Sequence, residues 1–521
     1  MKKRNFIIVL IFTLLIQFCH IQAQEINVTI LHTNDHHGAL EPFEIEGQKE
    51  VGGISARTTF IKEIREKVEK QNGGLLVLDC GDINTGTAFS DFLKAKPDIH
   101  IMNVIGYDAM ALGNHEFDLT LKQLIKQSKQ AKFPYLAANI FYRESEKLVF
   151  NDVVLFDIKG LTIGVFGITT ADTPAVSTYG NNKKIKFVEP EQVIPKTLKK
   201  LKKQADLIIG IMHLDHSKAV QLAKKFPGID IIIGGHTHIA TPEPVKAENT
   251  MIVEADCHGT MVGKFDLVFK NNKLKSYKYK LIGINLTKAI TDENNKILCK
   301  PYNKKFGPDP KIEKIMNKYR KQIVDILNQP IGILKEDVLK GKEKKRYISS
   351  PIGNLVTDAI KEITNADIAL QNFGGLRGEL FKGRIAYKDI HQVLPFDNKI
   401  YIYKMNGSKI LEIFKEMVSG KIGPSGFMEA SGLSLQIKNN KFVNVKINNK
   451  PIILDAKYKV AINSFIARGG DCYTVFKKEK PLYKTNINLD ESLTKYIRKH
   501  SPIVPDKTKR IQILSKTIDK K

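Results

Sequence analysis

Two kinds of hydrophobic pattern alternate along the first half of the chain. Short continuous apolar runs, among them residues 26–31, 75–78 and 207–212, are typical of buried strands. The stretch 51–69 instead carries apolar residues three and four positions apart, which predicts an amphipathic helix. Because strands and helices alternate in this way, the pattern favours an α/β fold built on a parallel sheet.

The pattern changes near residue 303. Residues 303–310 hold asparagine, glycine and two prolines, a composition typical of a linker. The charged segment 311–327 predicts a connecting helix whose apolar side is formed by Ile312, Ile315, Met316, Tyr319, Ile323 and Ile326. A second unit follows from Ile331. We therefore expect one domain at 24–302, a linker and connecting helix at 303–330, and another domain at 331–521, which a length of 521 residues allows.

The first 23 residues have the pattern of a secretory signal. Lys2, Lys3 and Arg4 precede an apolar run at 6–18, and Ala23 offers a small residue for cleavage. The run is too short to span a membrane comfortably, which disfavours an uncleaved anchor. The remaining sequence holds no second apolar stretch of spanning length. We expect an exported protein, periplasmic or extracellular, with no transmembrane segment after cleavage.

Charge and cysteine content bear on whether the protein binds nucleic acid and on the state of its thiols. The formal net charge is +27, and a basic surface attracts anions. Because the lysines are spread over the whole chain, a solvated lysine-rich surface is the better interpretation. The sequence has no arginine-rich arm and no Cys/His finger, and specific nucleic-acid binding is therefore not predicted. The cysteines after the signal region, Cys80, Cys257, Cys299 and Cys472, form no Cys-x-x-Cys pair. We expect Cys80, which ends an apolar run, to be a buried thiol.

Polar clusters follow five of the apolar runs, where open α/β sheets place their sites. They supply carboxylate, amide and imidazole groups from Asp35, His37, Asp82, Asn114, His213, His236 and His238. Mixed nitrogen and oxygen ligands of this kind suit Zn²⁺ or Mn²⁺ better than Ca²⁺. Asp82 has two carboxylate oxygens and could bridge two cations. We expect His36 to point away from the ligands, to a position behind them or at the surface.

The cluster around which this set is organised is Gly113-Asn114-His115-Glu116-Phe117-Asp118. Asp118 lies three residues after His115, close enough for its carboxylate to orient the imidazole. In isolation a polar turn would explain these residues. Alongside the ordered ligand set, we interpret them as part of a metal-dependent catalytic site.

The five clusters together resemble the calcineurin-like metallophosphoesterases, and residues 31–38 and 113–118 resemble the 5′-nucleotidase branch in particular. The resemblance implies a four-layered α/β/β/α first domain and two divalent metal ions, Zn or Mn, with Mg as a further option. One ion would be held by Asp35, His37, Asp82 and His238, and the other by Asp82, Asn114, His213 and His236. His115 would be catalytic without binding metal, and Asp118 would orient its ring and favour its protonated form.

The resemblance extends through the second domain and implies a nucleotide site. Its residues would be Arg346, Asn372, Arg377, Phe396, Phe465 and Asp471. Arginine suits phosphate groups, two phenylalanines can sandwich a planar base, and Asp471 can accept hydrogen bonds from ribose hydroxyls. Taken alone, Phe396 would more often belong to a core. Its place among the other matching segments favours contact with a ligand.

The sequence thus predicts an exported dinuclear-metal phosphohydrolase that converts nucleoside 5′-monophosphates to nucleosides and phosphate. The second domain would be a smaller α/β nucleotide-specificity domain. Hydrolysis of UDP-sugars or other nucleotide diphosphates is an expected extra activity. The alternatives are a 2′,3′-cyclic-nucleotide phosphodiesterase and, from a different class, a non-catalytic exported nucleotide- or nucleic-acid-binding protein. The expected partners are nucleotide substrates, and the sequence leaves both a monomer and a homodimer open.

Overall fold

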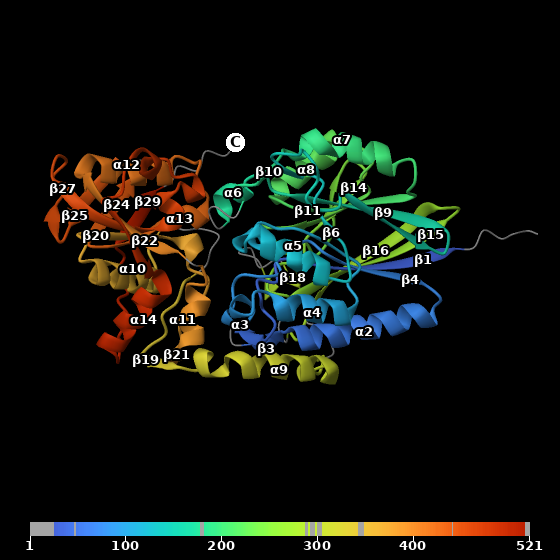
Figure 1. The fold of residues 1–521 in the computed structure, drawn as a ribbon, viewed down its shortest axis with the longest axis horizontal. Helices are drawn as coiled ribbons and strands as arrows, with labels where there is room; N and C mark the ends of the chain where they lie inside the picture. Colours follow the sequence, from blue (N-terminus) through green and yellow to red (C-terminus); the bar gives the residue numbers. More distant parts are fainter. Residues whose placement is uncertain are drawn as a thin grey trace, which may run out of the picture.

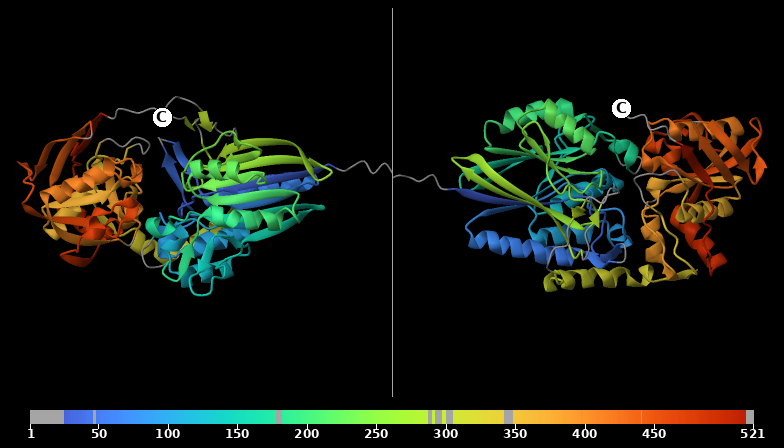
Figure 2. Two further views of the ribbon diagram at one scale, coloured as in Figure 1. Left: turned by 90° about the horizontal axis from the view of Figure 1, so that it is seen from above. Right: turned by 180° about the vertical axis from the view of Figure 1, so that it is seen from behind.

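The computed structural model describes residues 25–45, 48–177, 182–286, 290–291, 297–299, 305–341, 348–396, 398–439 and 441–515. It forms two α/β units that lie side by side, with the long helix α9 (Pro310–Leu327) running along one edge (Figure 1). The two units are also distinct in the views from above and from behind (Figure 2). The predicted signal at 1–23 and Arg346 lie outside the described residues. None of the helices in the described ranges is long and apolar enough to cross a membrane.

Two six-stranded sheets form the centre of the N-terminal unit. The first has the order β16 (Lys273–Gly283), β15 (Met261–Lys270), β1 (Ile26–Thr33), β4 (Gly74–Asp79), β5 (Ala109–Ala111) and β6 (Tyr135–Leu136). The second has the order β13 (Val245–Ala247), β14 (Thr250–Val253), β12 (Ile231–Gly235), β11 (Leu207–His213), β9 (Leu161–Thr169) and β8 (Val153–Ile158). Strands β1, β4, β5 and β6 are parallel, as are β9, β11, β12 and β14.

Helices cover the outer face of each sheet. The apolar side chains between the sheets are fully buried, for example Ile30 of β1 and Ile211 of β11. Helices α2 (Ile54–Lys70) and α4 (Lys96–Ile105) pack on the first sheet, and α9 packs against the outer side of these two helices. Helices α7 (Pro190–Leu201) and α8 (His216–Lys225) pack on the second sheet (Figure 1). The predicted α/β/β/α layering is confirmed. Cys80, directly after β4, is fully buried in the layer between the sheets, also as predicted.

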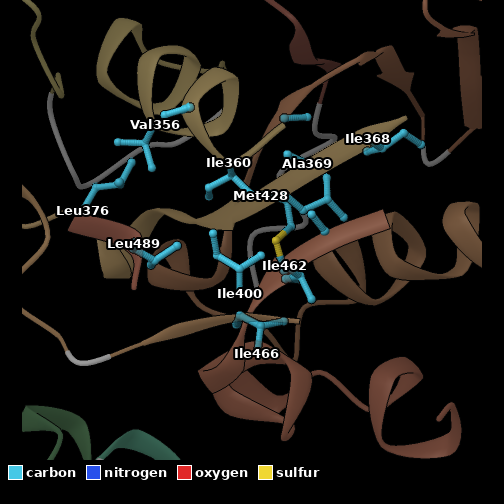
Figure 3. Packing of buried hydrophobic residues seen from close by; sticks show 14 of the residues in the cluster. Val356, Ile360, Ile368, Ala369, Leu376, Ile400, Met428, Ile462, Ile466 and Leu489 are labelled. Carbon is cyan, nitrogen blue, oxygen red and sulfur yellow. The ribbon is translucent and has the colours of Figure 1, made fainter. Parts of the chain in front are cut away.

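The C-terminal unit has its own mixed sheets and core. The larger sheet has the order β23 (Met428–Ser431), β20 (Ile368–Asn372), β27 (Lys457–Asn463), β22 (Lys399–Asn406) and β28 (Tyr483–Asn488). The smaller has the order β26 (Lys450–Pro451), β25 (Lys441–Ile447), β24 (Leu433–Lys438) and β29 (Ile511–Ser515). Helices α10 (Pro351–Thr364), α12 (Gly407–Val418) and α14 (Leu489–His500) pack around them. Figure 3 shows Val356 and Ile360 of α10 facing Ile400 and Ile462 of the larger sheet.

Helix α9 begins after Asp309, whose carboxylate accepts hydrogen bonds from the backbone N–H groups of Lys311 and Ile312. Its predicted apolar side is buried at Ile312, Met316, Tyr319 and Ile323. The prediction was wrong for Ile326, which is 48% exposed. Leu327, four residues after Ile323, packs on the core instead, because residues four apart share one side of a helix.

Candidate metal and nucleotide site

The predicted metal ligands lie at one edge of the two sheets, because the central strands of each sheet run parallel and their carboxyl ends meet there. The ligands that follow or end these strands are Asp35 and His37 after β1, Asp82 after β4, Asn114 after β5, His213 in β11, and His236 and His238 after β12. Apart from His236 and His238, all of these residues are fully buried. The structure therefore brings together all seven residues that the sequence singled out.

One cluster of donor atoms joins Asp35, His37 and His238. The Nε2 atoms of the two histidines are 3.0 Å apart. Asp35 Oδ1 lies 3.8 Å from His37 Nε2 and 3.5 Å from His238 Nε2. Two imidazole nitrogens and a carboxylate oxygen thus converge on one point, which fits the donor set of a divalent transition metal.

A second cluster joins Asp82, His213 and His236, with Asn114 beside them. Asp82 Oδ2 is 3.1 Å from His213 Nε2, and Asn114 Oδ1 is 2.9 Å from His236 Nδ1. Asp82 also forms a third group of donor atoms with His37 of the first cluster and His115. A carboxylate between two donor clusters fits a pair of ions with Asp82 between them.

The backbone at these ligands is strained. Asp35, His37, Asp82, His236 and His238 all have φ between 48° and 82°. Non-glycine residues in this left-handed region cost on the order of 1–3 kcal/mol each and persist only where the surrounding structure holds them. The contacts around these five residues must therefore hold this conformation, as they must at the other positive-φ residues of the described loops.

Glu116, to which the sequence analysis gave no role, holds two of the ligand loops together. Its carboxylate accepts hydrogen bonds from the N–H groups of Asp82 at 2.9 Å, Ile83 at 2.9 Å and Gly113 at 2.7 Å. A Cβ atom at Gly113 would lie 2.2 Å from Asp82 Oδ1, so only glycine permits this close approach. Burial, reinforced by Asp82, raises the pKa of Glu116 to about 7.

Asp82 and His213 form a charged pair at the bottom of the site. Burial alone would raise the pKa of Asp82, but His213 and His115 outweigh it and hold that pKa well below its usual range. Burial likewise opposes charge on His213, yet Asp82 and Asp35 raise its pKa well above the ordinary value. A cation bound here would replace the imidazole proton, since a metal ligand must be deprotonated.

His115 lies beside the predicted ligands, and a hydrogen bond with Asp118 orients its ring. His115 Nδ1 is 2.6 Å from Asp118 Oδ2, and its backbone N–H donates to Asp82 Oδ1 at 2.7 Å. Burial lowers the pKa of His115, but Asp82 and Asp118 outweigh it, so the net shift is upward. The expected position of His36 behind the ligands is found, and the surface alternative is wrong: it is 2% exposed and its Nε2 lies 3.2 Å from Asp79 Oδ2.

The predicted nucleotide residues of the C-terminal domain face the same cavity. The cavity measures about 840 Å³ and is lined by Asp82, Asn114 and His115 from one domain and by Asn372, Arg377, Phe396, Phe465 and Asp471 from the other. Arg377 Nη2 reaches to 3.4 Å from His37 Nε2, and the ring of Phe396 stacks on that of His115. Arg468 and Lys477, which the sequence analysis did not select, also line it.

Asp471 lines the cavity from the C-terminal domain. Asn372 Nδ2 donates to Asp471 Oδ2 at 2.8 Å. Burial raises the pKa of Asp471 to about 6, although hydrogen bonds from Asn372 and Ser425 oppose the shift. Phe465 packs flat against the backbone of Gly470, where a Cβ atom would lie 2.4 Å from the ring. One loop therefore presents both an aromatic ring and a carboxylate to the cavity.

Comparison with known proteins agrees with this architecture. Residues 28–240 match the family model of calcineurin-like phosphoesterases, and residues 330–478 match that of the 5′-nucleotidase C-terminal domain. Protein UshA of Yersinia enterocolitica is 33% identical over 510 residues, which cover 92% of each chain. A 5′-nucleotidase of Vibrio cholerae is 33% identical over 511 residues, 91% of each chain.

Solved structures share the fold over nearly the whole length. A 5′-nucleotidase precursor from Thermus thermophilus superposes with a TM-score of 0.81 at 28% identity, covering 94% of this chain and 100% of that one. The sulfate thiohydrolase SoxB of the same organism superposes with a TM-score of 0.76 at 17% identity, which shows a shared fold alone. From these matches over both domains, the chain belongs to the 5′-nucleotidase family of calcineurin-like phosphoesterases.

Proposed function

We propose that this protein hydrolyses nucleoside 5′-monophosphates to nucleosides and inorganic phosphate. The observation that carries the proposal is a single cavity lined both by His115 and members of the two donor clusters and by Phe465 and Asp471. A nucleotide complements both groups of residues. Its phosphate is an anion that bound metal ions attract, and its base is a planar ring that can stack on an aromatic side chain. Relatives named 5′-nucleotidases match over 91% of the chain and support the same activity.

The donor clusters are the proposed metal site. Asp35, His37, Asp82 and His238 would hold one divalent ion, and Asp82, Asn114, His213 and His236 the other. Two such ions, when bound, would supply Lewis-acid polarisation of the phosphoryl group and stabilise charge on the attacking and leaving oxygens. Zn²⁺ and Mn²⁺ suit the mixed nitrogen and oxygen donors, and Mg²⁺ is a further option.

His115 is the proposed catalytic residue that binds no metal. Asp118 engages Nδ1 of the ring, so Nε2 is the nitrogen available to the cavity. A protonated Nε2 can donate a hydrogen bond to a phosphoryl oxygen or to the leaving oxygen of the nucleoside. That bond strengthens as negative charge develops in the transition state, which is how an acid group accelerates the reaction.

The C-terminal residues are proposed to bind the rest of the substrate. Arg377 approaches the metal end and suits the phosphate, because a guanidinium donates two parallel hydrogen bonds. Phe396 and Phe465 would contact the base, and Asp471 would accept hydrogen bonds from ribose hydroxyls. We extend the proposal to UDP-sugars and related nucleotide diphosphates as additional substrates, and to export of the protein after removal of residues 1–23.

A substrate panel tests the proposal. Phosphate release is measured with AMP, UMP, UDP-glucose, 2′,3′-cyclic AMP and p-nitrophenyl phosphate after chelation and re-addition of Zn²⁺, Mn²⁺ or Mg²⁺. We expect the highest kcat/KM with the 5′-monophosphates. Preference for the cyclic nucleotide would favour the phosphodiesterase alternative. Absence of turnover together with nucleic-acid binding that falls steeply with salt would favour the non-catalytic alternative.

A further inference from the structure

A short segment after strand β14, residues 254–258, lies between the two loops that carry Asp35, His37 and His238. No donor cluster in the described part of the chain includes a residue of this segment. It nevertheless contacts both loops by hydrogen bonds. The segment therefore links the two loops without supplying a donor atom to either cluster.

Glu254 is tied to the loop that carries His238. Its carboxylate accepts hydrogen bonds from the Thr237 hydroxyl at 2.8 Å and from the Ile239 N–H at 3.1 Å, on either side of His238. Its own N–H donates to the Thr241 hydroxyl at 2.7 Å. The residue is fully buried. A buried carboxylate needs hydrogen-bond donors, and this loop supplies them.

The loop needs such support because its backbone is strained. His236 has φ of 82° and His238 has φ of 53°, both in the left-handed region that non-glycine residues rarely adopt. Residues in that region hold their conformation only when neighbouring groups fix it. Loss of the Glu254 carboxylate would leave the Thr237 hydroxyl and the Ile239 N–H without this acceptor, and His238 would lose its fixed direction.

Asn34 ties the same segment to the opposite loop. Its Oδ1 accepts a hydrogen bond from the Ala255 N–H at 2.9 Å, and its Nδ2 donates to Asp35 Oδ2 at 2.7 Å. The His258 N–H donates to the Asp35 carbonyl oxygen at 2.7 Å. Segment 254–258 thus contacts both loops, which are also joined directly by the His236 N–H donating to Asp35 Oδ2 at 2.9 Å, and Asp35 Oδ1 lies 3.5 Å from His238 Nε2.

We propose that Glu254 and Asn34 are positioning residues that fix Asp35 and His238 for one metal ion and so set the affinity of that ion. The inference rests on the proposed metal site. Partners behind metal ligands typically contribute 10–100-fold to metal affinity. Glu254 binds the residues on either side of His238. Its loss should therefore weaken binding of the ion at Asp35, His37 and His238 more than binding of the ion at Asp82, His213 and His236.

The test is Mn²⁺ binding to the metal-stripped full chain by calorimetry. Glu254→Ala should weaken one of the two binding events about 10–100-fold and leave the other close to its parental affinity. Glu254→Gln should bind Mn²⁺ at this site with close to the parental affinity, since its amide oxygen can accept from the Ile239 N–H and its amide nitrogen can donate to the Thr237 hydroxyl. Thr237→Val should lower the Mn²⁺ affinity of the same site. Glu243→Ala, which removes a nearby exposed carboxylate, should bind as the parent does.

The outcomes separate this inference from the proposed function. Parental affinities at both sites in Glu254→Ala and Thr237→Val would overturn the inference alone. If Glu254→Ala weakens Mn²⁺ binding equally at both sites and lowers the unfolding temperature of the metal-free protein, Glu254 has a structural role only, and the inference is also overturned. If Glu254→Ala does not fold, Thr237→Val decides by the same criteria. A parent chain that binds no divalent ion would contradict the proposed function, and this inference with it.

Discussion

The ring of Phe396 in the C-terminal domain stacks on the imidazole of His115 in the N-terminal domain, with ring centroids 5.7 Å apart and planes inclined by 23°. The guanidinium of Arg377 lies 5.8 Å from the centre of the same phenyl ring. Phe396 therefore contacts both His115 and Arg377, whereas Phe465 packs on Gly470 of its own domain. The two phenylalanines should respond differently to substitution.

Replacing Phe465 by alanine should affect only substrates that carry a base. Stacking of a base on an aromatic ring is worth about 1–3 kcal/mol, so kcat/KM for AMP should fall about 5- to 150-fold. Turnover of p-nitrophenyl phosphate should stay near that of the parent. Phe396→Ala should reduce both activities, because it also removes the ring that packs on His115. A half-buried phenylalanine of the C-terminal core, Phe442, provides the matched control. Equal losses on both substrates in Phe465→Ala would assign this residue to the core.

His115→Asn should separate catalysis from metal binding. Removal of an acid group typically lowers kcat by about 10²–10⁴-fold, and the loss should occur with both ions retained. Elemental analysis of the purified variant gives the metal content, and saturation kinetics with AMP give kcat. Asp118→Asn keeps the imidazole and weakens only the bond that orients it, so its kcat should fall less than that of His115→Asn. If His115→Asn loses one ion, His115 is a ligand and its proposed role is wrong.

Asp471 should give nucleotide hydrolysis a pH dependence that aryl phosphates lack. Its pKa, raised to about 6 by burial against hydrogen bonds from Asn372 and Ser425, means that the carboxylate is largely ionised above pH 6 and protonated below it. Protonation removes an acceptor for ribose hydroxyls, so KM for AMP should rise as the pH falls through about 6. Because the second ionisation of the AMP phosphate also has a pKa of about 6, the parent and Asp471→Asn are compared on the same substrate. The ratio of kcat/KM for AMP in the parent to that in Asp471→Asn should fall as the pH falls through about 6. A step that persists in the variant must come from another group.

Chelation should lower the thermal stability of the protein. An ion that binds only the folded state adds about 2.7 kcal/mol when its free concentration is 100 times Kd. Removal also leaves the strained ligand backbone without the bonds that an ion would make. Differential scanning calorimetry with and without a chelator should show a lower transition temperature for the stripped N-terminal domain. An unchanged transition would mean that no ion is bound under those conditions.

The sequence predicted that the seven proposed ligands come together, because each of them follows or ends a buried strand and the parallel topology gathers these strand ends. It gave no indication of Glu254, whose partners Ile239 and Thr237 lie 15 and 17 residues away. A single glutamate in a loop is usually a solvated residue. Glu116 stood inside a recognised motif, yet its three backbone partners depend on how two loops meet in space.

The helical pattern predicted the burial of α9 only approximately. Ile326 and Leu327 fit the apolar stripe about equally well by spacing, and the packing of the last turn decides between them. The relation between Phe396 and His115 was also beyond the sequence, since it depends on the arrangement of two domains. Their motifs predicted that Phe396 contacts the base and that His115 acts at the phosphate, but did not indicate that the two rings are in contact.

If the protein is a nucleotidase with two ions bridged by Asp82, bound Mn²⁺ and phosphate release from AMP should rise together as Mn²⁺ is added to the stripped protein. We expect no turnover after chelation, turnover once the second equivalent binds, and loss of turnover along with most of the bound metal in Asp82→Ala. Full turnover in the presence of chelator, or normal turnover and metal content in Asp82→Ala, would contradict this prediction.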